Sequence, residues 1–470
     1  MYTGSIVERY ASSKMVAIWG PMEKVIMERK LWVTVLKAQD ALGIVGRQIP
    51  DGAIRAYEKN IANVDLEQIR VRELETRQDV TARIAEFNSL AGYECVHLGM
   101  TSRDQTDNTE QCQILASLKI VRDKTVAILS RFAAKALQFK LRNMCGRTHN
   151  VPAQTIRLGK RFANFAEELL IAFERLEHLI EVYPLRGIKG ATGTQQDMLD
   201  LLGSPEMVKR LEEIVAEELG FRRVLESVGQ VYPRSLDYEV LSVLTQLASA
   251  PGNFAKMVRL MAGIELAHEG FKEGQDGSSA MPHKMNSRTC ERINGLVHVL
   301  GGFGEMTKAL IGDQWYEGDV SCSVIRRVAL PGAFFALDGI YESLMTVLDE
   351  MEVFYVMVER ELERYLPFVS STRLLTAVVK KGMDREKARK IIKKHATSAI
   401  RSMRGGGDNC FAEDLARDED FPLDGGEIET LLATPKTGLA EEQVDAVCAK
   451  VCVLVRRYPE AEVCNPEPLL

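Results

Sequence analysis

The side chains with the clearest chemical potential lie in the segment GFKEGQDGSSAMPHKMN, residues 270–286. It places the hydroxyl of Ser278 six residues before the ammonium of Lys284, and the amide of Asn286 follows shortly after. A lysine beside a helix N-terminus favours a carboxylate or phosphate, because its charge and the unpaired backbone N–H groups both attract anions. Composition alone is equally compatible with a mobile anion-binding loop and with a surface loop whose serine caps the next helix.

Two further segments carry polar groups between long apolar patterns. GRTHNVPAQ contains His149, one of seven histidines, and a histidine that titrates near neutral pH can donate a proton to a leaving group. For a single loop histidine, a structural hydrogen-bonding role is the commoner alternative. HLGMTSRDQTDN offers the hydroxyls of Thr101 and Ser102, while Ser102 or Asp104 can also cap the helix expected to follow.

The elements that position these segments are expected to be long helices. Apolar residues recur mostly at intervals of three and four, and long stretches lack Gly and Pro, which indicates amphipathic helices. Helices of this length would reach roughly 40 Å and bury best by packing nearly antiparallel, within the chain or between copies. The clearest patterns span residues 106–140, 155–183, 238–270, 287–311 and 331–357.

This helical pattern predicts an all-α fold with three domains. We place an N-terminal helical domain at residues 1–106, a central long-helix bundle at 107–360 and a C-terminal helical domain at 361–470, where glycines break shorter helical patterns. A homo-oligomer is expected, because long bundle helices can bury their remaining faces against other copies.

Composition and charge exclude several classes of protein. The chain is 46% hydrophobic and 27% charged, as ordinary globular proteins are, and its net charge of -6 disfavours nucleic acid as a partner. The basic stretch at 380–404 intersperses apolar residues at helical spacing, which favours a solvated helix face. We find neither a secretory segment nor an apolar run long enough to span a membrane, so a cytoplasmic protein is expected.

Motif spacing gives no indication of a metal or a cofactor. The nine cysteines form no CxxC pair and are expected to be reduced thiols. No HExxH, Walker loop or histidine pair at metal-ligand spacing occurs, and GGFG at 301–304 falls inside a helical pattern. We therefore expect a protein that needs neither a metal ion nor a cofactor.

The segment that contains Ser278 resembles the GSSxMPxKxN signature of the fumarase and aspartase superfamily at every position. The resemblance implies a fumarase/aspartase-like fold whose long helices form a multi-helix core in the oligomer. It also implies that Ser278 removes a proton next to a carboxylate, and that Lys284 and Asn286 hold that carboxylate. Such a step builds a doubly charged aci-carboxylate, which a fixed cation and amide donors can stabilise.

The two other polar segments are similar to further elements of the same superfamily. GRTHNVPAQ resembles its THxxxAQ element, which implies that His149 protonates the departing nitrogen and that Thr148 contacts substrate. HLGMTSRDQTDN resembles its HxGxTSxD element, which implies that Thr101 and Ser102 bind a substrate carboxylate and adds His97 to the site. A serine base must act as an alkoxide, so nearby cations and a loop closure that expels water are expected.

Four other segments, ERYAS, SVGQVYPR, CERIN and EGDVSCSVIRR, resemble the adenylosuccinate lyase branch of the superfamily. This implies phosphate binding by the first and last, substrate contact by the second, and a supporting acid and a substrate-facing arginine from the third. It further implies a homotetramer with shared active sites that eliminates fumarate from adenylosuccinate, giving AMP, and from SAICAR, giving AICAR. The phosphate-binding residues are Arg9 and Tyr10 of ERYAS and Ser323 and Arg327 of EGDVSCSVIRR. The substrate contact is Gln230 of SVGQVYPR, and CERIN supplies the acid Glu291 and the arginine Arg292.

One position departs from the family pattern. Where the family reads RHD, this chain has Arg77, Gln78 and Asp79, which we expect to contact substrate, and the family's histidine works with the residue matched by His149. A glutamine can hydrogen-bond a phosphate or an imidazole but cannot carry a proton near neutral pH. Either His149 acts without a second histidine or turnover is impaired. Our hypothesis is that His149 suffices and Gln78 orients it.

Two alternative functions are compatible with the same signature. A 3-carboxymuconate cycloisomerase also resembles the SSAMPHKxN string but handles a substrate without phosphate. The phosphate-binding residues Arg9, Tyr10, Ser323 and Arg327 argue against it. An enzyme-derived structural protein is the other alternative. The glutamine at position 78 favours it, whereas the retention of Ser278 and Lys284 disfavours it.

Overall fold

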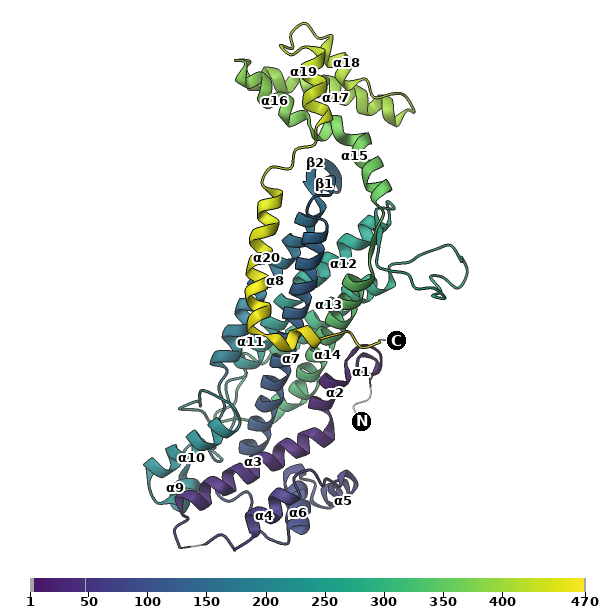
Figure 1. Cartoon of the computed structure of the whole chain (residues 1–470). Coiled ribbons are helices and arrows are strands. Elements are labelled where there is room, and N and C mark those ends of the chain that lie inside the picture. Colours follow the sequence, from purple (N-terminus) through teal and green to yellow (C-terminus); the bar gives the residue numbers. More distant parts are fainter. Residues whose placement is uncertain (1–3, 47, 469–470) are drawn as a thin grey trace.

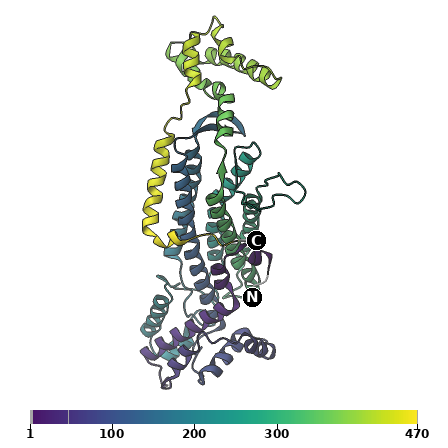
Figure 2. The ribbon, with the colours of Figure 1, turned by 45° about the vertical axis from the view of Figure 1, so that its right-hand side comes forward.

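The computed structural model describes residues 4–46 and 48–468, and most of its regular structure is α-helical (Figure 1). The predicted all-α fold is confirmed. The molecule is elongated, with a bundle of long helices between an N-terminal group of helices and a C-terminal helical region (Figures 1 and 2). In the described part of the chain, no helix is both long and apolar enough to cross a membrane.

The N-terminal region packs short helices against the long helix α3. Trp32, Tyr57 and Phe87 form an aromatic core there, because α3, α4 and α6 each direct one large apolar side chain inward. Asp65 and Gln78 cap α5 and α6 with their side chains. The elements are α1 (Ser5–Tyr10), α2 (Ser13–Trp19), α3 (Pro21–Leu42), α4 (Ala53–Lys59), α5 (Leu66–Thr76) and α6 (Asp79–Ala91).

The bundle buries apolar faces that isolated helices would leave in water. Phe132, Phe162 and Phe254, from three of its helices, pack together in its core. Its elements are α7 (Ser102–Gln138), α8 (Leu158–Val182), α11 (Ser235–Leu247), α12 (Ser249–Ala262), α13 (Arg288–Lys308) and α14 (Ser321–Glu350), with α9 (Gln196–Leu202) and α10 (Pro205–Glu218) between α8 and α11 in the sequence.

Several elements differ from the sequence-based expectation. An antiparallel hairpin of β1 (Asn143–Thr148) and β2 (Val151–Arg157) precedes α8, where a loop and a helix start were expected. The pattern over 238–270 is divided between α11 and α12, which meet at Ala248, and is followed by β3 (Ala267–His268), paired with β4 (Glu352–Val353). α14 continues through Pro331, because extensive burial against α13 outweighs one lost backbone hydrogen bond.

The C-terminal region has a core of its own around Leu374, Phe411 and Ile428. The last long helix, α20 (Ala440–Arg457), then returns to pack along α7 and α8, and a 3-10 helix follows at Pro459–Val463. The domain boundaries after residues 106 and 360 stay a prediction. The elements of the separate core are α15 (Tyr355–Val369), α16 (Ser371–Lys380), α17 (Arg385–Arg404), α18 (Phe411–Ala416) and α19 (Gly425–Ala433).

Candidate active site

The sequence-predicted side chains fall into three groups in one chain. The first, which we term the α7–α14 cluster, lies near the starts of these helices and comprises Arg77, Gln78, Asp79, His97, Thr101, Ser102, Gln230, Ser323 and Arg327. The second is the tip of the β1–β2 hairpin, with Thr148 and His149. The third is the signature loop, residues 270–286, with the start of α13 and the end of α1: Ser278, Lys284, Asn286, Glu291, Arg292, Arg9 and Tyr10.

The start of α6 holds the α7–α14 cluster together. The side-chain oxygen of Gln78 caps α6 by accepting the N–H of Thr81, and its amide nitrogen donates to Ser102 Oγ at 3.0 Å. Arg327 of α14 lies 3.6 Å from Asp79. Residues of α7 and α14 are therefore bridged by two neighbouring side chains of one short segment.

The start of α7 is fixed by buried contacts. Thr101 and Asp104 form a capping box, in which the Asp104 carboxylate accepts the N–H of Thr101 at 2.7 Å, so the predicted capping by Asp104 is confirmed. Just before it, Nδ1 of His97 accepts the indole N–H of Trp32 at 3.0 Å. An indole nitrogen only donates, so the proton of a neutral His97 is on Nε2, and burial lowers the pKa of this histidine.

Arg103, which was not among the predicted residues, reaches from the start of α7 to the start of α14. Its guanidinium donates to Ser323 Oγ at 2.6 Å and to the backbone carbonyl of Asp319 at 3.4 Å. The available signal was an arginine directly after Ser102 in a segment already assigned to substrate binding.

A buried set of alternating charges supports this cluster. Asp107 lies 2.9 Å from Arg234, 3.3 Å from Arg103 and 3.5 Å from Arg326. Burial raises the pKa of nearby Glu110, but the cations around it, Arg326 foremost, lower it to about 2. The surroundings of the cluster therefore stabilise negative charge strongly.

His149 and Asn150 form the two-residue turn of the hairpin. Their φ values of 51° and 59° are those of a type I′ turn, in which both central residues are left-handed. Arg147 braces the turn by donating to the carbonyl of Asn150 at 2.8 Å and pairing with Glu361 of α15. The exposed Thr148 and His149 are thus presented outward on a supported tip.

The signature loop projects from the bundle between β3 and α13 (Figures 1 and 2). Ser278 Oγ accepts the N–H of Met281 at 3.2 Å, and Lys284 is exposed on the same loop. The side-chain amide of Asn286 donates to the carbonyl of Gly277 at 2.8 Å, which draws the two sides of the loop together. The predicted base, cation and amide therefore belong to one projecting turn.

Glu269, a further residue that was not predicted, fixes the point at which the loop ends. Its buried carboxylate accepts the N–H groups of Thr289 and Cys290 at 2.8 and 2.7 Å, in the first turn of α13. An acid beside a helix N-terminus is favourable, but Glu269 precedes α13 by a whole loop. Only the folded chain brings it there.

The start of α13 carries the remaining predicted residues. The guanidinium of Arg292 lies over the ring of Tyr10, 5.2 Å from its centre. Glu291 faces Arg259 of α12 at 4.0 Å. Arg9 precedes Tyr10 at the end of α1, so the N-terminal segment and α13 together form one side of this group.

The α7–α14 cluster is widely separated from the other two groups within one chain. α7 has 37 residues and therefore separates Ser102 from the hairpin by about 55 Å. Ser323 is near the start of the 30-residue α14, whereas the signature loop begins beside Glu350 at its end, about 40 Å away. Gln78 and His149, which were expected to act together, are thus remote from one another in a single chain.

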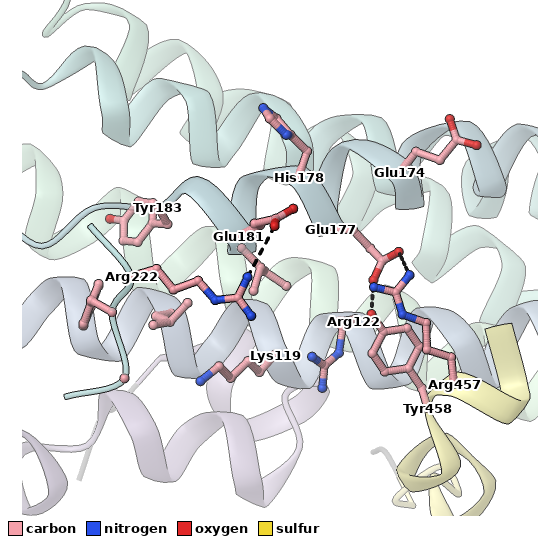
Figure 3. Close-up of a pocket in the computed structure, with 14 residues that line it drawn as sticks. Lys119, Arg122, Glu174, Glu177, His178, Glu181, Tyr183, Arg222, Arg457 and Tyr458 are labelled. Carbon is pink, nitrogen blue, oxygen red and sulfur yellow. Dashed lines mark hydrogen bonds and ion pairs between the residues drawn. The ribbon is translucent and has the colours of Figure 1, made fainter. Parts of the chain in front are cut away.

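Two cavities bear on the location of the site. One of about 350 Å³ adjoins the α7–α14 cluster and is lined in part by Asp79 and Arg327. Another of about 550 Å³ lies between α7, α8 and the end of α20 (Figure 3), where Arg457 pairs with Glu177 at 3.1 Å. None of the predicted side chains lines the second cavity. Within residues 4–46 and 48–468, no group of three or more His, Cys, Asp or Glu is placed to hold a metal ion.

Comparison with known proteins adds a family to this geometry. A family model described as Lyase matches residues 10–302, and one described as Adenylosuccinate lyase C-terminus matches residues 367–447. The chain is 33% identical to adenylosuccinate lyase of Saccharomyces cerevisiae, over 96% of this chain and 94% of the relative. It is 32% identical to adenylosuccinate lyase of Schistosoma mansoni, over 94% and 93%.

Solved structures share the fold at lower identity. A fumarate lyase from Mesorhizobium sp. has a TM-score of 0.80 at 19% identity and covers 96% of this chain and 99% of its own. A 3-carboxy-cis,cis-muconate lactonizing enzyme from Pseudomonas putida has a TM-score of 0.82, also at 19% identity, with 95% and 98% covered. These similarities establish the three-dimensional arrangement of the helices.

Proposed function

The chain belongs to the adenylosuccinate lyase family, and we propose that it is a carbon-nitrogen lyase that eliminates fumarate from adenylosuccinate, leaving AMP. The same chemistry on the related ribonucleotide SAICAR gives AICAR, and both reactions serve purine nucleotide biosynthesis. The proposal is carried by one observation: a chain that matches an adenylosuccinate lyase over 96% of its length keeps Ser278 and Lys284 on one projecting loop.

Elimination removes one proton from carbon and delivers one proton to nitrogen. The Ser278 alkoxide takes the proton next to a succinyl carboxylate, and the C–H electrons form an aci-carboxylate that the Lys284 cation and the Asn286 amide stabilise. These electrons become the C=C bond of fumarate as the C–N bond breaks. His149 gives its proton to the leaving nitrogen, which stays on AMP as the amino group.

Ser278 becomes a base only if its alkoxide is stabilised. Its oxygen already accepts a backbone N–H in the open loop, and Lys284 supplies a positive charge from the same loop. Closure over the substrate expels water and strengthens both interactions. Gly274 has a φ of 81°, which suits a hinge that residues with side chains would resist.

Substrate binding is divided between the two anionic ends of the molecule. We propose that Thr101, Ser102, Lys284 and Asn286 hold the succinyl carboxylates. The phosphate is bound by Arg9, Tyr10, Ser323 and Arg327. The remaining contacts come from Arg77, Asp79, His97, Thr148, Gln230 and Arg292, while Glu291 supports the site.

We propose that Gln78 takes a positioning role in place of a second histidine. Its amide nitrogen is used by Ser102, and its carbonyl oxygen accepts the Thr81 N–H with one of two lone pairs, which leaves the other to accept an N–H of the protonated His149 ring when a second copy brings the hairpin close. His149 then protonates the leaving nitrogen alone. Its exposed position at the hairpin tip suits a group contributed to another subunit.

We propose a homotetramer, and the separation of the α7–α14 cluster from the other two groups supports active sites that are shared between subunits. A single chain holds the α7–α14 cluster about 40 to 55 Å from the loop and the hairpin, so one chain cannot surround one substrate. Val320, Val324 and Val328 also form an apolar stripe along the first turns of α14, with exposed fractions of 69%, 70% and 50%. Trp315 and Tyr316, shortly before α14 in the sequence, are exposed as well. Such a surface is typical of a subunit contact.

The cellular setting follows from the same chemistry. We propose a cytoplasmic enzyme whose partners are its small substrates and its own copies. All nine cysteines are free thiols, which suits a reducing compartment. The net charge of -6 argues against nucleic acid as a ligand.

Fumarate release from adenylosuccinate tests the proposal directly. The purified chain is mixed with adenylosuccinate, and fumarate is followed by its ultraviolet absorbance and identified by chromatography. We expect Ser278→Ala to lower kcat about 10²- to 10⁴-fold, the usual contribution of a positioned base, and Ser279→Ala to change it little. A flat trace from the unaltered chain, or equal rates for the two variants, contradicts the assignment. Turnover of 3-carboxymuconate instead would favour the cycloisomerase alternative.

A further inference from the structure

We propose that Arg103 is a further phosphate-binding residue, which acts with Ser323 and Arg327 on the 5′-phosphate of adenylosuccinate. The inference rests on the proposed function, because it names the group that one residue recognises.

The guanidinium lies between the two helix starts that carry the predicted substrate contacts. Arg103 directly follows Ser102 in α7, and its Nη2 donates to Ser323 Oγ at 2.6 Å and to the carbonyl of Asp319 at 3.4 Å. Since Ser323 accepts this hydrogen bond, its own O–H is available to a phosphate oxygen. Arg103 therefore sets the direction in which Ser323 donates.

The helix start beside Arg103 suits the same anion. α14 is a 30-residue helix whose first turn is at Ser321, and its positive dipole end faces the region that Ser323 occupies. Arg327 follows Ser323 one turn later on the same face of α14. A phosphate held there meets two guanidiniums and one hydroxyl.

Arg103 shares its carboxylate partner with other arginines. Its carboxylate partner is Asp107 at 3.3 Å, but Asp107 is also 2.9 Å from Arg234 and 3.5 Å from Arg326. Arg326 also pairs with Glu110 and Asp237, so Arg103 shares Asp107 with two other arginines in a network of three guanidiniums and three carboxylates. A phosphate would give Arg103 an anion of its own, which an arginine can bind through two parallel charged hydrogen bonds.

A purely structural role is the competing explanation, since Arg103 also joins α7 to α14. Loss of a phosphate-binding residue slows only the reaction of a substrate that carries the phosphate, whereas loss of a structural residue slows the reaction of both substrates. The variant Arg103→Met is compared with the unaltered chain on adenylosuccinate and on the same compound without its 5′-phosphate. Arg131→Met serves as the matched control, because Arg131 is an ion-paired arginine of α7 bound to Asp349, far from the cluster.

We expect Arg103→Met to lower kcat/KM for adenylosuccinate about 10- to 100-fold, the range for a hydrogen bond to a charged group. The value for the compound without phosphate should change less than about twofold, and the affinity for AMP measured by calorimetry should fall by the same factor as kcat/KM. The value of kcat/KM for Arg103→Lys should lie between those of the unaltered chain and Arg103→Met, because lysine keeps the charge but lacks the planar guanidinium that gives two parallel hydrogen bonds.

Equal losses for the two substrates, or no loss for either, would overturn the proposal. If Arg103→Met does not fold, the ratio of the two losses in Arg103→Lys decides in its place. If the unaltered chain releases no fumarate, the proposed function fails, whereas the calorimetric comparison of AMP binding by the variants still tests Arg103.

Discussion

Gln78 shows how one side chain can be both an element of the fold and a part of the site. Its carbonyl oxygen caps α6 and its amide holds Ser102, so its geometry is fixed before any substrate arrives. A histidine at this position could donate to Ser102 but would replace the capping carbonyl with a ring nitrogen. The residue is therefore suited to positioning and cannot relay a proton.

We expect Gln78→His to change kcat for adenylosuccinate by less than about tenfold, because His149 remains the proton donor. Steady-state fumarate formation is the measurement, and Gln68→His on the neighbouring helix α5 is the control. A gain of several orders of magnitude would show that the unaltered chain lacks a working acid, contrary to the hypothesis that His149 suffices.

His97 makes the stability of the folded protein depend on pH. Burial lowers its pKa in the folded state, and the Trp32 indole N–H already occupies Nδ1. As the pH falls below about 6.5, the unfolded chain binds a proton that the folded chain resists, so stability is lost toward acid. We expect His97→Gln to weaken this dependence.

The measurement is the free energy of unfolding in urea between neutral pH and the onset of carboxylate titration. The difference in slope between the two proteins should reach up to about 1.4 kcal/mol per pH unit. Carboxylates common to both chains cancel in the comparison. Identical slopes would mean that His97 titrates normally.

Residues that are chemically conspicuous in the sequence were predictable, and those that depend on packing were not. Ser278 and Lys284 stand in a ten-residue signature, so their loop could be placed without a structure. Arg103 lies in a predicted segment, yet its partner Ser323 is far along the chain. Glu269 gains its role only when a loop returns to it.

At the level of elements, Glu269 joins the two ends of the signature loop, because its carboxylate just before the loop accepts N–H groups at the start of α13. We expect Glu269→Ala to destabilise the protein by about 0.5 to 2 kcal/mol, the range for a lost helix cap, and to expose the amides of Thr289 and Cys290 to faster hydrogen exchange. Glu273→Ala, an exposed acid within the loop, is the control. Unchanged exchange at those two amides would show that the carboxylate does not hold the helix start.

The long helices were foreseeable because their apolar period extends over many turns, whereas short elements were not. The hairpin from Asn143 to Arg157 has few residues per strand, and its turn uses His149 and Asn150 without a glycine. The helical pattern was expected to begin at residue 331, but α14 begins at Ser321. In α14, tertiary burial overrides the tendency of proline to interrupt a helix.

In the whole molecule, the residues of the proposed active site lie at places that one chain cannot bring together. The bundle is rigid because its core is tightly packed, so a distance of about 55 Å between Ser102 and the hairpin persists in any single copy. Association of copies is the remaining way to unite the cluster, the hairpin and the loop. We therefore propose that each active site takes groups from more than one subunit.

Mixing two inactive variants tests this claim most directly. Ser278→Ala subunits keep an intact hairpin, and His149→Gln subunits keep an intact loop. After refolding as a 1:1 mixture, we predict fumarate formation at roughly a quarter of the unaltered rate, because random assembly gives that fraction of sites both groups. A mixture of Ser278→Ala and Lys284→Met, both altered in the loop, should stay inactive. If the first mixture is no more active than the average of its components, the loop and the hairpin do not meet across subunits.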